Sequence, residues 1–213
     1  MRLGHRGRAV KAGAVCAVLA LAMILGQGAR ADLITNGNFA SPGVNGGWNI
    51  YSTVPGWTLS ADGLEIDNST ILGLTCHDAD CQSAELNGNT FDTITQTVTG
   101  LVIGNSYMLS WAYGDRPGSG LQQLNVYFGN TLITANHGTG SGAWSNNVFT
   151  ITATATTENL VFQAVNVGGN PSIGNEIDDV SLVRTTPVPE PASLVLLVAG
   201  LIGLGCVRAR RRA

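Results

Sequence analysis

Carboxylate side chains are the first residues of this sequence whose spacing could support chemistry. Asp62, Glu65 and Asp67 stand close together, and Asp78 and Asp80 form a second group. Carboxylates in loops are the hard oxygen ligands that Ca²⁺ prefers, and a pair of them can hydrolyse a glycosidic bond. Neither group has the full ligand spacing of a calcium-binding loop, however, and Glu65 and Asp67 alternate with apolar neighbours. We therefore interpret these two as the solvent face of a strand.

Side chains for nucleophilic catalysis are scarce in the central part of the chain. Between residues 32 and 184 the histidines are His77 and His137. Ser119 and Ser141 stand among glycines but do not fit the Gly-x-Ser-x-Gly pattern of a nucleophile elbow. The glycine-rich run 138–142 is followed by no lysine, so it predicts a turn and not a phosphate-binding loop. The sequence predicts that this protein is not an enzyme, and a glycoside hydrolase is the least favoured alternative.

Aromatic and polar side chains near predicted loops are the main candidates for ligand binding. Sugars pack on exposed aromatic rings while a few polar groups bond their hydroxyls. The residues with this combination are Trp48, Tyr51, Tyr113, Asp115, Arg116, His137 and Trp144. Arg116 could instead pair with a nearby acid, and core packing is the alternative role for the aromatic rings. For Trp57 and Trp111, core packing is the role we expect.

Two of the four cysteines lie in the central part of the chain. Cys16 and Cys206 belong to the terminal segments, which leaves Cys76 and Cys81. A pair this close in an exported chain predicts a disulfide. A structural zinc site is the alternative, but it requires four ligands and only His77 stands nearby. We expect the disulfide to restrain a surface loop.

Charge is distributed unevenly along the 213 residues. The whole chain has 11 basic and 14 acidic residues, a net charge of −3. Residues 32–186, however, contain 13 acidic residues against two arginines, Arg116 and Arg184, which makes −11. A nucleic-acid-binding domain needs a basic face. Nucleic acid is therefore excluded as a partner of this region.

The elements that must position these side chains are predicted to be strands. Apolar and polar residues alternate along 93–98, 107–113, 124–128, 149–153, 160–165 and 176–183. Turn residues separate these runs at 100–105, 129–130 and 138–142. Period-two patterning with turns at short intervals is typical of an all-β sandwich. We predict one such domain over residues 32–184.

The N-terminal residues 1–31 have the three parts of a secretory signal peptide. A basic region precedes an apolar stretch, and Ala29 and Ala31 then form a small-x-small cleavage site. We expect signal peptidase to cut after Ala31. An uncleaved membrane anchor is the alternative.

The C-terminal residues combine a stiff spacer, an apolar helix and a basic tail. Residues 185–191 are rich in proline, and 192–207 are uncharged and proline-free. As a helix, the second segment would extend roughly 24 Å, a little short of the bilayer's hydrocarbon core. The basic residues that follow are Arg208, Arg210, Arg211 and Arg212. Such a tail stays cytoplasmic, so we predict a transmembrane helix with the central domain outside.

This arrangement resembles the PEP-CTERM sorting signal over residues 188–212. Its core element is Val188-Pro189-Glu190-Pro191, ahead of the helix and the arginines. The resemblance implies bacterial export, recognition by an exosortase, and cleavage near the Pro-Glu-Pro element. It further implies transient anchoring in the cytoplasmic membrane, followed by transfer to the cell surface or the extracellular matrix. A permanent C-terminal anchor is the alternative.

The central domain resembles the galactose-binding-like jelly rolls. The matching segments are residues 33–39, 55–58, 84–88, 94–98 and 175–182, in the order that the family has them. The resemblance implies an extracellular binding module. It also implies a structural Ca²⁺ at Asp178 and Asp179, although Ala40 stands where the family often has an acidic partner. No other cofactor is expected.

Together these features predict an exported, non-catalytic module that binds carbohydrate or extracellular polysaccharide. A structural matrix protein without a sugar site is the second hypothesis. Exposure of Trp48 and Trp144 is the property that should separate the two.

Overall fold

A computed structural model describes residues 31–60 and 62–185 of the chain. The predicted signal peptide up to residue 30, the spacer from residue 186, the transmembrane helix and the arginine tail lie outside the described residues. Among the residues described, no helix has the length and apolarity needed to cross a membrane.

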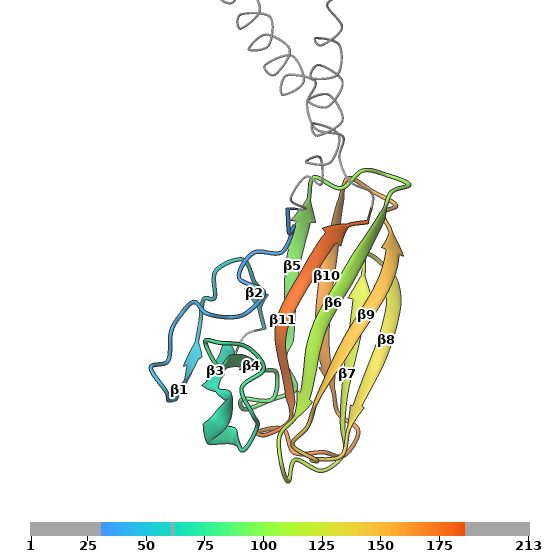
Figure 1. The fold of residues 1–213 in the computed structure, drawn as a ribbon. Coiled ribbons are helices and arrows are strands. Elements are labelled where there is room, and N and C mark those ends of the chain that lie inside the picture. The colour runs from blue at the N-terminus through green and yellow to red at the C-terminus, as the bar shows by residue number, and fades with distance from the viewer. Residues whose placement is uncertain (1–30, 61, 186–213) are drawn as a thin grey trace, which may run out of the picture. The chain divides into compact units, whose positions relative to one another are not determined.

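The described residues form a sandwich of two antiparallel sheets (Figure 1). The six strands of the first sheet are, in spatial order, β1 (Trp48–Tyr51), β3 (Leu64–Asn68), β4 (Gln82–Glu85), β11 (Asn175–Arg184), β6 (Ser106–Asp115) and β9 (Trp144–Thr152). The five strands of the second are β2 (Thr58–Leu59), β5 (Thr93–Thr99), β10 (Thr157–Val165), β7 (Gln122–Phe128) and β8 (Thr131–Gly138). A 3₁₀ helix, η1 (Ser69–Leu72), follows β3. The prediction of an all-β jelly-roll sandwich is confirmed.

Alternation along the strands places the core between the two sheets. Tyr107, Leu109 and Trp111 point inward from β6, and Phe162 meets the Trp111 ring from β10 with a centroid distance of 5.7 Å. Trp57 and Trp111 are both buried, as predicted. The period-two pattern thus correctly indicated which face of the central strands is apolar.

Strand β8 was not predicted, and its position explains why. It pairs only with β7 in the second sheet and forms that sheet's edge. Its side chains are mostly exposed or half-buried, including the exposed Leu132. An edge strand with two partly solvated faces gives no clear alternation, because neither face has to be apolar.

Residues 69–81, here called the covering loop, fold back over the outer face of the first sheet. Leu72 and Leu74 of this loop are buried outside the main core. The Thr75 carbonyl accepts a hydrogen bond from the Trp144 indole on β9 at 2.7 Å. His77 lies over β11 and β9, within 2.8 Å of Asp179 and 2.9 Å of Asn146. The loop therefore removes much of this face from solvent.

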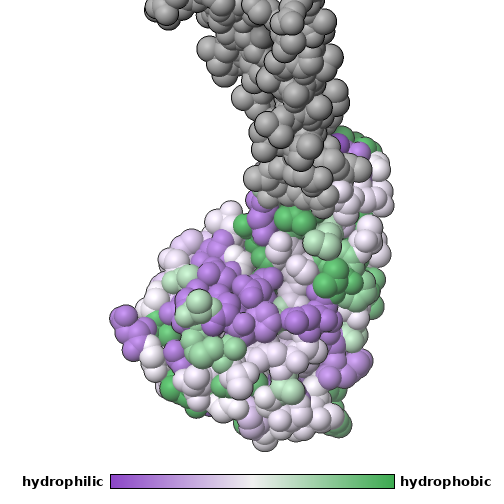
Figure 2. All heavy atoms as spheres, in the orientation of Figure 1, coloured by the Kyte–Doolittle hydropathy of each residue, from purple (hydrophilic) through white to green (hydrophobic). Residues whose placement is uncertain are grey.

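Burial on the outer face of β3 overturns one prediction. Glu65 and Asp67 do alternate with core residues of β3, but the face they occupy is not solvated: Glu65 is 7% exposed and Asp67 is 0% exposed. Hydrophilic residues gather over the side of this face where β11 meets β3 and β4 (Figure 2). The solvent-face interpretation is wrong because this face is enclosed: Gly88 lies against Glu65, and Leu72 of the covering loop lines the same hollow as Glu65.

Candidate functional site

A hollow with a volume of about 440 Å³ lies beside β1 and is here called hollow 1. Trp48, at the start of β1, has 59% of its surface exposed and lines the hollow. The other lining residues are Ile50, Glu65, Ile71, Leu72, Gly88, Asn89, Arg116, Ser172 and Ile173. The hollow thus combines one exposed aromatic ring and several aliphatic side chains with a small number of polar groups.

Arg116 gives hollow 1 its charged wall. Its Nη1 lies 2.9 Å from Oε2 of Glu85, which is fully buried on β4. The alternative that Arg116 pairs with an acid is therefore confirmed. Burial raises the pKa of Glu85 to about 7, against the opposing effects of Arg116 and of the Gly174 amide that donates to this carboxylate. The pairing still leaves one side of Arg116 against the hollow.

Tyr51 lies on the same strand as Trp48 but does not line either hollow described here. Its hydroxyl donates to the Gly43 carbonyl at 3.3 Å, and the side chain is half-buried. The structure therefore places Tyr51 beside the N-terminal loop. Its predicted role in ligand binding stays a prediction.

A second hollow, hollow 2, measures about 200 Å³ at the ends of β6, β8 and β9. It brings together four of the residues predicted from sequence, namely Tyr113, Asp115, His137 and Trp144. The structure thus divides the predicted ligand-binding set between two places. Trp48 and Arg116 belong to hollow 1 and these four belong to hollow 2.

Asp115 organises the turn beside hollow 2. Its Oδ2 accepts from the backbone amides of Thr139, Gly140 and Ser141 at 2.7, 2.6 and 2.9 Å, and its Oδ1 accepts from the Ser141 hydroxyl at 2.8 Å. Burial by itself would raise the pKa of Asp115, but these hydrogen bonds outweigh it and hold the pKa below its ordinary value. Asp115 is therefore a buried anion that anchors residues 138–142.

The two aromatic residues of hollow 2 are engaged within the protein. Tyr113 is buried, its hydroxyl donates to Asn175 at 2.9 Å, and burial raises its pKa. The Trp144 ring lies close against Gly114, where an added Cβ would approach it to 3.0 Å. Together with its bond to the covering loop, this contact makes Trp144 part of the loop's anchorage. Of the two tryptophans meant to separate the hypotheses, only Trp48 is broadly exposed.

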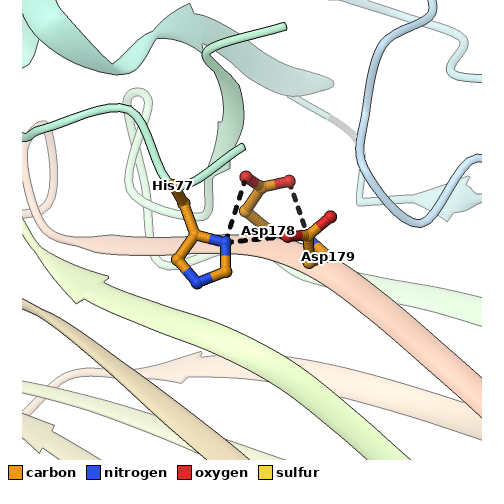
Figure 3. A group of neighbouring side chains, drawn as sticks. All are labelled: His77, Asp178 and Asp179. Atoms are coloured by element: carbon orange, nitrogen blue, oxygen red, sulfur yellow. Dashed lines mark hydrogen bonds and ion pairs between the residues drawn. The ribbon is translucent and has the colours of Figure 1, made fainter. Parts of the chain in front are cut away.

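Asp178 and Asp179 of β11 lie beside His77 of the covering loop (Figure 3). His77 Nδ1 lies 2.8 Å from Asp179 and 3.8 Å from Asp178. Burial raises the pKa of Asp178 to about 8, and the charges of Asp179, Asp78 and Asp80 add to this effect. The three side chains are close enough to share a cation, so the predicted Ca²⁺ at Asp178 and Asp179 stays a prediction.

The predicted disulfide is confirmed, because Cys76 and Cys81 are bonded. The bridge closes residues 76–81 at the end of the covering loop, where His77 contacts β11 and β9. This excludes the alternative of a zinc site with cysteine ligands. The bridge shortens the flexible part of the loop and favours its position over the sheet.

Sequence reasoning missed a third group, on the outer face of β3, β4 and β11. Glu65 pairs in register with Glu85, and Glu85 pairs with Glu176, so the three glutamates form a row across the strands. Asp67 lies on the same face of β3, two residues further along. The spacing of two residues between Glu65 and Asp67 placed them on the same face of a strand, but no local pattern indicated their neighbours on β4 and β11.

Comparison with known protein families gives one match, to the PEP-CTERM protein-sorting motif, over residues 187–212. This chain carries a PEP-CTERM sorting motif. The prediction from the Val-Pro-Glu-Pro element, the apolar run and the arginine cluster is thereby confirmed. A PEP-CTERM motif marks a chain for export and acts as a membrane-anchoring C-terminal signal. No curated protein matches this chain.

Several solved structures share the general strand arrangement at low identity. TmCBM61 in complex with β-1,4-galactotriose is 14% identical, with 72% of this chain and 99% of that one covered at a TM-score of 0.47. The C-terminal family 22 carbohydrate-binding module of Clostridium thermocellum Xyn10B is 12% identical, with 69% and 99% covered at 0.46. The enzymatically active domain of bacteriophage CBA120 tailspike protein 4 is 13% identical, with 72% of this chain covered at 0.47. This chain spans only 21% of that tailspike domain.

Proposed function

We propose that this protein is an exported, non-catalytic module that binds extracellular polysaccharide in hollow 1. The observation that carries the proposal is Trp48, a large aromatic side chain that is 59% exposed at the edge of a hollow of about 440 Å³. An exposed indole ring beside a hollow offers an apolar face on which the C–H face of a sugar ring can pack. The sorting motif supports the extracellular setting.

The remaining walls of hollow 1 suit a neutral sugar. Arg116, Asn89 and Ser172 offer donors and acceptors for hydroxyl groups, while Ile50 and Ile71 extend the apolar surface. Glu65 contributes one carboxylate to the wall. Because the surrounding region is strongly acidic, an anionic polysaccharide would be repelled.

The non-catalytic part of the proposal rests on the accessibility of the acids. Glycoside hydrolysis by the usual routes needs two carboxylates that flank the bond. Glu65 lines hollow 1, but its carboxylate neighbours Asp67 and Glu85 are both 0% exposed and do not line it. A bound sugar would therefore meet one carboxylate only.

We also propose exosortase as the processing partner, with cleavage near Pro189-Glu190-Pro191 and delivery to the cell surface or matrix. The sorting motif supports this proposal. Intact-mass measurement of the protein recovered from the cell surface tests it. A chain that still ends at residue 213 would contradict processing.

Glycan-array screening followed by calorimetric titration tests the sugar site. The full chain in detergent micelles should bind a neutral glycan, and Trp48→Ala should weaken binding by about tenfold or more, the loss of one stacked ring. Trp48→Phe should retain part of the affinity. Val148→Ala removes an equally exposed side chain on β9, away from hollow 1, and should have no effect. Absence of binding to every glycan, including the producer's own polysaccharide, would favour a structural matrix protein.

A further inference from the structure

Four carboxylates lie together on the outer face of β3, β4 and β11, beside Arg116. Glu65, Asp67, Glu85 and Glu176 all point away from the sandwich core, because their strand neighbours Leu64, Ile66, Ala84 and Ile177 belong to it. Three of the four are 0% exposed and Glu65 is 7% exposed. The positive charge near them is Arg116, which is bound to Glu85. The group is thus a concentration of negative charge in a place with little water.

Two of these carboxylates are poorly hydrogen-bonded. Within the described residues, both oxygens of Asp67 and both oxygens of Glu176 are buried without a hydrogen bond of normal geometry, although Glu65 lies near Asp67 and the Ser83 hydroxyl lies near Glu176. Buried carboxylates in proteins normally receive hydrogen bonds or meet an ion, since an unsatisfied one costs several kcal/mol. Glu176 stands opposite Glu85 in the sheet, so its unsatisfied oxygens belong to the same group.

We propose that Glu65, Asp67, Glu85 and Glu176 form a binding site for a divalent cation of the calcium class. One carboxylate oxygen from each of Glu65, Asp67 and Glu85 lies within 4.8 Å of the others. Ca²⁺ bonds oxygen at about 2.3–2.6 Å, so ligands on opposite sides of one ion stand up to about 5 Å apart. The spacing of the three oxygens therefore allows all of them to reach one ion.

The chemistry of the donors selects the class of metal. The four side chains supply only carboxylate oxygens, which suit Ca²⁺ and disfavour zinc or copper, since these prefer nitrogen and sulfur. Four carboxylates and one guanidinium have a charge of −3 when ionised, and a divalent ion reduces it to −1. A bound ion would give the buried oxygens of Asp67 and Glu176 a positively charged partner.

Hollow 1 supplies a route for the ion. Glu65 lines the hollow and is the one member of the group with exposed surface. Gly88 lies directly over it, and a Cβ at that position would come within 2.9 Å of Glu65 Oε2. A cation could therefore reach Glu65 from solvent and pass to the buried oxygens. The site is distinct from the predicted Ca²⁺ position at Asp178 and Asp179, which meet His77 instead.

Terbium luminescence and thermal unfolding test the site without any sugar. Tb³⁺ replaces Ca²⁺ in oxygen sites, and Trp48, which lines the same hollow as Glu65, can sensitise its emission. We expect saturable Tb³⁺ emission from the full chain in detergent micelles, displaced by Ca²⁺. The unfolding temperature should rise with the logarithm of Ca²⁺ concentration and return to its starting value with chelator.

Charge-neutral variants locate the ion. Asp67→Asn and Glu176→Gln should each weaken Tb³⁺ binding on the order of tenfold, because fewer charged ligands remain. Far-ultraviolet circular dichroism shows whether each variant is folded. Asp62→Asn removes an exposed acid that belongs to neither carboxylate group and should leave Tb³⁺ affinity unchanged.

Two results would overturn the cation site. The first is a wild-type protein with neither Tb³⁺ emission nor any Ca²⁺-dependent change in unfolding temperature. The second is loss of binding in Asp179→Asn, a change in the His77 group, together with normal binding in Asp67→Asn and Glu176→Gln. Either result leaves glycan binding by Trp48 intact, so the two proposals fail separately.

Discussion

Two buried aspartates on the first sheet have opposite environments. Asp115, at the end of β6, receives four hydrogen bonds from residues 139–141, and its pKa is held below the ordinary value. Asp67, on β3, receives none within the described residues, and its pKa is raised to about 9 by burial and by the charges of Glu65 and Glu85. The difference teaches that burial alone does not determine the state of a carboxylate. The hydrogen-bond donors around the carboxylate determine whether it is ionised.

The first and largest expected effect of this difference is on the pH dependence of stability with a chelator present. Asp67 faces Glu65, Glu85 and Arg116, and its folded pKa of about 9 lies above the unfolded value of about 3.9. Between these values the unfolded state is ionised while the folded state holds a proton. The free energy of unfolding should therefore fall by roughly 1 kcal/mol per unit as pH rises from 5 to 8. Urea unfolding followed by tryptophan fluorescence measures the slope.

Asp115 should act in the opposite direction. Its folded pKa is depressed, so its stabilisation is present above the unfolded pKa of about 3.9 and is lost as pH falls through the folded pKa. Asp67→Asn should make the fall above pH 5 less steep, leaving the contributions of Glu85 and Asp178, whose pKa values burial also raises. Asp115→Asn should leave that fall unchanged and abolish the loss of stability at acid pH. An unchanged slope in Asp67→Asn would contradict the contrast between the two sites.

The second prediction concerns Asp115→Asn, which we expect to lower the free energy of unfolding by about 3 kcal/mol at pH 7. The amide can replace only part of the acceptor capacity, so backbone amides of residues 139–141 lose a charged partner. Asp62→Asn, at an exposed position, is the matched control and should change stability little. A loss as small as that of the control would mean that water replaces the carboxylate.

The third prediction is an increase in the free energy of unfolding, where the second is a decrease. In chelator at pH 7, Asp67→Asn should raise the free energy of unfolding by about 2 kcal/mol, since the amide is neutral in both states, needs no proton on folding and can donate to Glu65. In saturating Ca²⁺ the same variant should lose most of this advantage, because the ion binds the wild type more tightly and therefore stabilises it more than the variant. Destabilisation in chelator would show that Asp67 has a donor that the structure lacks.

The fourth and smallest prediction divides the Asp115 interaction into its parts. Ser141→Ala removes the hydroxyl that donates to Oδ1 and leaves the three amide bonds in place. We expect a loss of about 1 kcal/mol, one hydrogen bond to a charged acceptor. Ser145→Ala removes a nearby hydroxyl that donates to the Tyr113 carbonyl at the longer distance of 3.2 Å. Ser145→Ala should lower the free energy of unfolding by less than Ser141→Ala does. Equal losses would mean that the charge on the acceptor is unimportant here.

Local patterns in the sequence determined a large part of this protein. The sorting motif at 187–212 consists of contiguous residues, so its order alone identifies it. Cys76 and Cys81 stand close enough along the chain to bond in almost any exported fold. The alternation in β5, β6, β7, β10 and β11 reveals strands with one apolar face, because successive side chains point to opposite sides.

The same alternation could not say what lies on the other face. The sequence pattern correctly predicted that Glu65 and Asp67 lie on the face of β3 opposite its core residues, but the prediction that this face is exposed to solvent was wrong. They are buried inside the first sheet, where β3 pairs with β4 and β4 pairs with β11, which brings Glu65 beside Glu85 and Glu85 beside Glu176, and Gly88 lies against Glu65. The same holds for the split of the predicted aromatic set into two hollows. Alternation along a strand is a local property of the backbone. The register between strands and the segments that cover a sheet face depend on contacts between residues far apart in the chain, so only the tertiary structure decided them.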